Sequence, residues 1–176
     1  MKKQRNIAYI DGQNLHLGTQ SDGWKVDTKK LRIYLRDKFD VDEAYYFLWF
    51  ISEDEQNLYN RLQKDWFIIV FREHSSALKG KKKWNVDVDI VFEMMKRIAD
   101  ERESFDKIVL VSGDGDYIKV VRYLIQKKIL KRVIFPNTNH SSLYKKLSNK
   151  CYCFLSSAKE KIEYIWNSNN KKKEGS

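Results

Sequence analysis

The sequence contains no run of about 18 consecutive apolar residues, the length that a transmembrane helix requires, so no segment is expected to cross a membrane. The N-terminal stretch MKKQRNIAYID holds only a short apolar segment, and this segment ends in an acid. Such a pattern is typical of a first strand and not of a signal peptide. We therefore expect a cytoplasmic protein.

Cysteine and histidine are both scarce. Cys151 and Cys153 form a C-x-C pattern, and the sequence has no second cysteine pair that would complete a zinc site. On a strand the two side chains would share one face, and we expect two ordinary core thiols in a reducing compartment. The scattered histidines indicate surface or packing roles, although the first of them lies close after Asp11: His16, His74 and His140.

The remaining composition is that of one packed domain. Of the 176 residues, 42% are hydrophobic and 14% are aromatic, which favours a folded core over a disordered chain. We expect a single domain over residues 1–167, followed by a polar, disordered tail over residues 168–176.

Positive charge is in clear excess. The formal net charge is +10 and the sequence pI is near 9.4, values that raise the local concentration of polyanions and suggest nucleic acid as a partner. A solubilising coat of lysines explains the same charge equally well. The lysines do form clusters, at residues 79–84, 127–132, 145–146 and 171–173.

Short β-branched or aromatic runs alternate with longer amphipathic runs along the chain. This alternation predicts a three-layer α/β/α sandwich with a mostly parallel central sheet. Strands are expected at residues 6–11, 43–50, 66–71, 107–112, 132–135 and 151–155. Helices are expected near residues 28–38, 54–64, 87–102, 116–127, 140–148 and 157–167.

Three acids follow predicted strands. Asp11 ends the first strand, and Asp114 and Asp116 follow the fourth strand in LVSGDGDYIKVV. Ligands of open α/β sheets bind beyond the carboxyl ends of the strands, where the strand order reverses, so these acids converge if the first and fourth strands are neighbours. Each acid taken alone can be a helix cap or a turn residue. The three together favour a shared site.

The helix expected at 87–102 supplies a fourth acid. At about 100° per residue, Asp87 falls on the flank of the predicted apolar stripe, Asp89 lies on the polar side, and Glu93 lies almost opposite and is expected to be solvated. Asp87 is therefore the best candidate for a fourth acid of the shared site, and Asp89 is a weaker candidate for a fifth. The stripe expected to face the core is Val88, Val91, Phe92, Met95, Ile98 and Ala99.

Four converging carboxylates cannot all stay ionised without compensation. Mg²⁺ and Mn²⁺ prefer oxygen ligands and also bind substrate phosphates. One or two such ions can activate a water molecule and neutralise charge on a phosphodiester. Central acids surrounded by lysines therefore predict a divalent-metal-dependent nuclease.

Three segments, AYIDGQNL, KGKKKWNVDVDIVFEM and LVSGDGDYIKVV, resemble the motifs of the NYN domain, in the LabA-like branch of the PIN-like nuclease superfamily. The resemblance covers residues 5–155, with all three motifs in order. It implies a PIN-like fold and, for many members, cleavage of RNA. An endoribonuclease acting on single-stranded RNA is favoured, although some members bind RNA without cutting it.

By this resemblance, Asn14 and Ser112 match supporting residues of the site. The Asn14 amide is expected to hold a metal-bound water or a phosphate oxygen. Ser112, with the backbone N–H groups of residues 113–115, is expected to face an anion or to anchor the loop. Four residues match the metal-binding, catalytic acids of the family: Asp11, Asp87, Asp114 and Asp116.

The resemblance also has departures. Glu93 stands where the family often has Asp, which argues against a metal role there, and Tyr117 replaces the usual Phe, which we expect to change little. Lys79 matches the lysine of the middle motif, and Trp84 offers a ring on which a base can stack. The segment is expected either to bind RNA at the rim of the acidic site or to be a solvated loop; its residues are Lys79, Lys81, Lys82, Lys83 and Trp84.

Two other functions compete with the nuclease. The stretch SGDGDY is similar to a late loop of haloacid dehalogenase phosphatases, but that chemistry needs an acid two residues after Asp11, where this chain has Gln13. A non-catalytic RNA-binding module is the second alternative. The residues themselves do not separate RNA from DNA, because none is identified as a reader of the 2′-hydroxyl.

Overall fold

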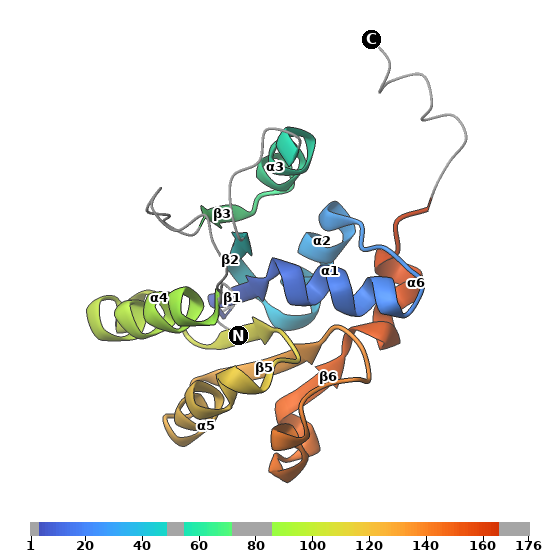
Figure 1. Ribbon diagram of the computed structural model, residues 1–176. Coiled ribbons are helices and arrows are strands. Elements are labelled where there is room, and N and C mark those ends of the chain that lie inside the picture. Colours follow the sequence, from blue (N-terminus) through green and yellow to red (C-terminus); the bar gives the residue numbers. More distant parts are fainter. Residues whose placement is uncertain (1–3, 49–54, 72–85, 166–176) are drawn as a thin grey trace, which may run out of the picture.

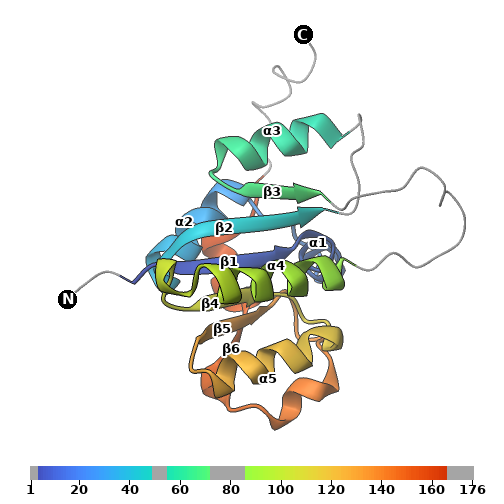
Figure 2. The ribbon, with the colours of Figure 1, turned by 90° about the vertical axis from the view of Figure 1, so that its left-hand side faces the viewer.

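The structure is a computed structural model that describes residues 4–48, 55–71 and 86–165. Its strands form one six-stranded sheet in the order β3-β2-β1-β4-β5-β6, and every neighbouring pair is parallel (Figure 2). Among the described residues, no helix is both long enough and apolar enough to cross a membrane. The strands are β1 (Asn6–Asp11), β2 (Val41–Leu48), β3 (Ile68–Phe71), β4 (Ile108–Val111), β5 (Leu130–Phe135) and β6 (Tyr152–Phe154).

Helices cover both faces of the sheet, which confirms the three-layer prediction. In Figure 1, α4 and α5 lie on one side of the strands, and α1, α2 and α6 lie on the other. The helices are α1 (Gly12–Ser21), α2 (Thr28–Phe39), α3 (Gln56–Lys64), α4 (Asp87–Asp100), α5 (Ile118–Gln126) and α6 (Lys159–Ile162).

Strand β1 is the centre of the core, and all six of its residues are buried. Ile7 and Tyr9 pack in the cluster beneath α4 and α5, whereas Ala8 and Ile10 pack in the cluster beneath α1 and α2. A strand that is covered on both faces has no polar side, which explains why the run is apolar throughout.

The order of the strands reverses between β1 and β4. The chain builds outward from β1 through β2 to β3 and then returns to place β4 against the other edge of β1. In this pairing Ile10 lies opposite Val111, so Asp11 and Ser112 leave the sheet side by side. The condition for convergence of the strand-end acids is therefore met.

Helix α1 is absent from the sequence prediction. Its sequence, GQNLHLGTQS, is rich in residues of modest helix propensity, and its buried residues are only Gly12, Leu15 and Thr19. The signal that was available is Asp11, whose carboxylate accepts a hydrogen bond from the Asn14 N–H at 2.9 Å as the N-cap of the helix.

Two other predicted elements differ. The helix expected at residues 140–148 is a short 3-10 helix, Ser142–Lys146, and in the described part of the one expected at 157–167 only α6 is α-helical. Cys153 lies in β6, whereas Cys151 ends the 3-10 turn before it, so the two thiols do not share a strand face. Both thiols are half-buried and free. The expected tail, residues 168–176, lies outside the described residues.

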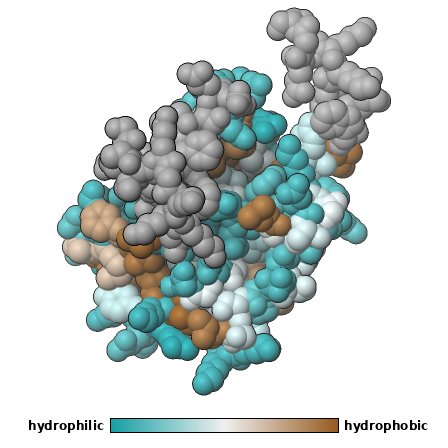
Figure 3. Space-filling model, in the orientation of Figure 1, coloured by the Kyte–Doolittle hydropathy of each residue, from teal (hydrophilic) through white to brown (hydrophobic). Residues whose placement is uncertain are grey.

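Helix α4 is rotated relative to the prediction. Val86, Ile90 and Met94 face the core, while Val88 and Phe92 are 68% and 61% exposed. Figure 3 shows the resulting hydrophobic surface over α4. The core-facing side also carries charge: Asp87 is buried, and Arg97 bonds to Glu43 and Tyr45 on β2. Of the predicted stripe, Val91 and Ile98 do pack against the core, so counting apolar residues alone placed the centre of the buried face wrongly but found its flank.

We predict that Gly12→Ala destabilises the fold even though alanine is the better helix former. A Cβ at this position would lie 2.5 Å from Cε1 of Tyr46 and 2.7 Å from the carbonyl oxygen of Phe47. The free energy of unfolding in urea should fall by about 1–3 kcal/mol, the usual cost of overpacking. Gln20→Ala, at an exposed position of the same helix, is the control and should be neutral or stabilising. A stable Gly12→Ala variant would contradict this tight helix–sheet contact.

Candidate metal centre

Three carboxylates from two separate segments meet at the carboxyl end of the sheet. Asp87 comes from the first turn of α4, and Asp114 and Asp116 come from the loop and short 3-10 helix after β4. One carboxylate oxygen from each lies within 4.8 Å of the others. Asp87 is buried, Asp114 is half-buried and Asp116 is exposed, so the group opens from the core to solvent.

Asp11 lies beside this group at the end of β1. It is buried, and burial is the main reason why the pKa of its carboxyl is raised, with a further contribution from the charge of Asp114. Hydrogen bonds from the Asn14 N–H at 2.9 Å and from the Tyr117 hydroxyl at 3.2 Å oppose that rise. The N-terminal end of α1 adds a favourable dipole.

Tyr117 is a site residue that the sequence analysis missed. Its side chain is fully buried, and its hydroxyl contacts both buried acids, Asp11 and Asp87. Burial raises the pKa of Tyr117, and the two carboxylates raise it further, so the hydroxyl remains a donor. Tyr117, which stands where the family usually has Phe, therefore places a hydrogen-bond donor among the acids.

The loop that bears Asp114 is anchored from several directions. The Gly113 N–H donates to Oδ1 of Asn14 at 2.8 Å, and the Asp114 N–H donates to the buried Ser112 hydroxyl at 3.1 Å. The Tyr144 hydroxyl donates to the Asp114 carbonyl at 2.6 Å. Asn14 and Ser112 thus position the acids, which supports the anchoring role for Ser112. Tyr144, in the short helix after β5, had no motif that could have revealed it.

The donor set fits a hard divalent cation. An octahedral ion with bonds of about 2.1 Å spans about 4.2 Å between opposite ligands, so donors up to 4.8 Å apart need only a small shift to share it. All the donors are carboxylate oxygens. Mg²⁺, Mn²⁺ and Ca²⁺ prefer such ligands, whereas zinc sites in proteins are mostly built from histidine and cysteine. The residues present can therefore hold a metal ion.

The acids line one side of a crevice of about 560 Å³ that runs along α1. Its far end contains Asn137, which donates hydrogen bonds to the Gly18 carbonyl and the Ser21 hydroxyl. No Lys, Arg or aromatic residue is among the described residues that line it: Asp11, Gln13, Asn14, Leu17, Gly18, Ser21, Val86, Asp87, Gly113, Asp114, Asp116, Asn137 and Asn139.

The weaker candidates lie farther from the centre. Asp89 and Glu93 are both half-buried on α4 and do not line the crevice. Glu93 is half-buried and not fully solvated as expected, and its charge contributes to the raised pKa of Tyr9. His140 stacks on Phe135 with ring centroids 4.2 Å apart, which is a packing role.

The lysine clusters are distributed around the molecule. Residues 127–132 span the turn after α5 and the first three residues of β5, at the amino end of the strands, opposite the acids. Lys145 and Lys146 are exposed next to Tyr144, on the acidic side. The lysine run at 79–83 and Trp84 lie outside the described residues, and their role stays a prediction.

Asp11→Asn should stabilise the metal-free protein. Because the pKa of Asp11 is raised in the folded state, its charge costs stability at neutral pH, and this cost disappears as the pH falls through that pKa. Asparagine retains the N-cap. In chelator at neutral pH, we expect the Tm to rise by about 2–4 °C, the shift that about 1 kcal/mol produces in a domain of this size. The gain should vanish in acid. Asp42→Asn, at an exposed residue of β2, is the control and should show neither effect. If Asp11→Asn is less stable than the wild type at every pH, burial of the Asp11 charge does not cost stability.

Tyr117→Phe should have the opposite effect in chelator. Removing the hydroxyl deprives Asp11 of a donor and should lower the free energy of unfolding by about 1–3 kcal/mol. With saturating Mn²⁺ the loss should shrink, because the cation then compensates the acids. Tyr123→Phe on α5 is the control, measured by thermal unfolding in both buffers. If Tyr117→Phe lowers the free energy of unfolding equally with and without Mn²⁺, the hydroxyl does not compensate the acids of the metal centre.

Comparison with known proteins agrees with this geometry. Low amplitude and bright protein LabA of Synechococcus elongatus is 24% identical over 136 residues, which cover 72% of this chain and 71% of LabA. The crystal structure of VPA0982, a Vibrio parahaemolyticus protein of unknown function, superposes with a TM-score of 0.70 at 17% identity, covering 93% of this chain and 99% of that one. That likeness shows the fold.

The three motifs, the parallel sheet and the acids at the β1–β4 junction coincide with one family. The chain matches the NYN domain over residues 6–158, which include every acid of the metal centre and every strand of the sheet. Because this match spans most of its length, the protein belongs to the NYN domain family, whose fold is that of PIN-like nucleases.

Proposed function

We propose that this protein is a ribonuclease that hydrolyses phosphodiester bonds of single-stranded RNA, as an endonuclease, with Mg²⁺ or Mn²⁺ bound by its aspartates. The observation that supports the proposal most strongly is the convergence of Asp87, Asp114 and Asp116 beside Asp11 at the switch point of the sheet. The family is generally one of nucleases. This chain has the four acids that its resemblance to the family assigns to the metal site: Asp11, Asp87, Asp114 and Asp116.

Each acid has a distinct task in this proposal. Asp11 and Asp87 form the floor of the centre: Asp11 caps α1 and accepts a hydrogen bond from the Tyr117 hydroxyl, and Asp87 lies in the first turn of α4. Asp114 and Asp116 lie at the open side, where an incoming phosphate would meet them. A bound divalent ion supplies charge neutralisation at the phosphate and lowers the pKa of the attacking water. The anchored loop keeps the acids in place before substrate arrives.

A non-catalytic RNA-binding module is the main alternative. Such a module has no need for a cluster of aspartates, because carboxylate charge repels phosphates unless a cation is bound. The phosphatase alternative is weaker, because position 13 is an exposed glutamine and no second acid stands there. The two free cysteines suit the reducing cytoplasm that the sequence suggested.

We expect the purified protein to cleave labelled single-stranded RNA in the presence of Mn²⁺ or Mg²⁺, and EDTA to abolish the cleavage. Asp114→Asn should reduce the rate at least about 100-fold, since loss of one electrostatic group at a reacting centre typically costs this much. Asp42→Asn should cleave like the wild type, and Asp89→Asn and Glu93→Gln should lose much less than Asp114→Asn.

The alternative makes a different forecast for the same samples. If the wild type binds RNA with high affinity but leaves it intact with every divalent ion, the protein is a binding module. If Asp11→Asn and Asp114→Asn both retain full cleavage, the activity comes from another site or from a contaminant.

A further inference from the structure

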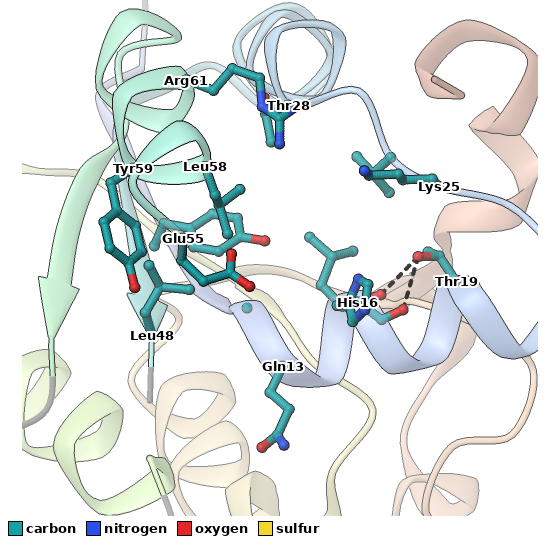
Figure 4. Close-up of a pocket in the computed structure, with 14 residues that line it drawn as sticks. Gln13, His16, Thr19, Lys25, Thr28, Leu48, Glu55, Leu58, Tyr59 and Arg61 are labelled. Atoms are coloured by element: carbon teal, nitrogen blue, oxygen red, sulfur yellow. Dashed lines mark hydrogen bonds between the residues drawn. The ribbon is translucent and has the colours of Figure 1, made fainter. Parts of the chain in front are cut away.

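A second pocket lies on the opposite side of α1 from the acidic crevice. It has a volume of about 390 Å³ and is enclosed by α1, by α3 and by the segment that leads into α2 (Figure 4). In Figure 4, His16 and Thr19 line it from α1, while Leu58 and Tyr59 line it from α3. Nothing in the metal centre uses this pocket.

The chemistry of the pocket complements that of the crevice. Lys25 and Arg61 supply positive charge, and the buried ring of Tyr46 supplies an aromatic wall. Leu48 and Leu58 add apolar surface. The crevice has acids but, among its described lining, no cation or ring to hold a nucleic acid. The groups that bind RNA phosphates and bases are thus gathered across α1 from the groups that would cut it.

Gln13 connects the two cavities. It lines both of them, because it lies in the first turn of α1, directly after Asp11 and Gly12. Farther along the helix the two cavities diverge: His16 and Thr19 face the pocket, whereas Leu17 and Gly18 face the crevice. A strand whose phosphate lies at the acids can therefore cross α1 only at its N-terminal end.

We infer that this pocket binds one nucleotide of the RNA strand, next to the phosphodiester that is cleaved. The base would pack against Leu58 and Tyr59, and the phosphate would lie towards Lys25 and Arg61. Glu55, the single acid of the described lining, accepts hydrogen bonds from base amino groups or ribose hydroxyls. The volume falls at the lower end of the range of about 300–1,000 Å³ for small-ligand sites, which suits one nucleotide. The inference rests on the proposed nuclease function.

The test uses the double variant Lys25→Ala/Arg61→Ala, since both side chains are exposed and their removal leaves the core intact. Its control is Arg122→Ala/Lys127→Ala, which removes the same charge from exposed positions on and just after α5. Binding of a labelled single-stranded RNA and of AMP, CMP, GMP and UMP is measured in EDTA, so that no cleavage interferes. Steady-state cleavage is measured separately with Mn²⁺.

We expect the pocket variant to weaken binding of RNA and of at least one mononucleotide about tenfold or more, a change of about 1.4 kcal/mol. The slope of log affinity against log salt should flatten by about 0.7 for each lost phosphate contact. KM should rise while kcat at saturating RNA stays unchanged, because the acids are untouched. Asp114→Asn should still bind the mononucleotide.

The two proposals can fail separately. If RNA is cleaved but the pocket variant matches the control in affinity, salt slope and KM, the pocket inference is overturned and the nuclease stands. If nothing is cleaved but nucleotide binding depends on Lys25 and Arg61, the nucleotide pocket is supported and the nuclease is overturned. Nucleotide binding that survives in the pocket variant would place the nucleotide site elsewhere.

Discussion

The parallel pairing of β1 with β4 is the constraint on which the site depends. It lies at the only reversal of strand order in the described sheet, and it sets Asp11 beside the loop that bears Asp114. A slip of one residue in this register would turn the side chains of β1 to the opposite faces and move Asp11 away from the loop. Burial of β1 on both sides resists that slip, because Ile7 to Ile10 are all needed in the two cores.

The electrostatic cost of the acids is shared between backbone and side chains. Asp11 and Asp87 lie at helix N-termini, and the Tyr117 hydroxyl, which contacts both acids, donates a hydrogen bond to Asp11. These contacts do not remove the cost entirely, since the pKa of Asp11 remains raised. A divalent cation bound by these acids would offset the rest, and binding of that ion to the folded state alone would then stabilise the protein.

Helix α1 organises both cavities. Its glycines allow close packing: a Cβ at Gly12 would meet the Tyr46 ring and one at Gly18 would meet Pro136. Held this tightly, the helix forms a thin wall with acids on one side and a cationic, aromatic pocket on the other. Among the described lining residues, lysine and arginine line only the pocket and the aspartates line only the crevice.

The sequence by itself determined the layer architecture, the strand-end acids and the family, because hydrophobic alternation and short motifs are local signals. Only the tertiary structure decided the rotation of α4 and the place of Tyr117. Helix α4 has apolar residues around most of its circumference, and its core-facing side includes Asp87 and Arg97, whose partners lie far away in the sequence. Periodicity counts apolar side chains and cannot recognise a buried charge whose compensating group comes from another strand or loop.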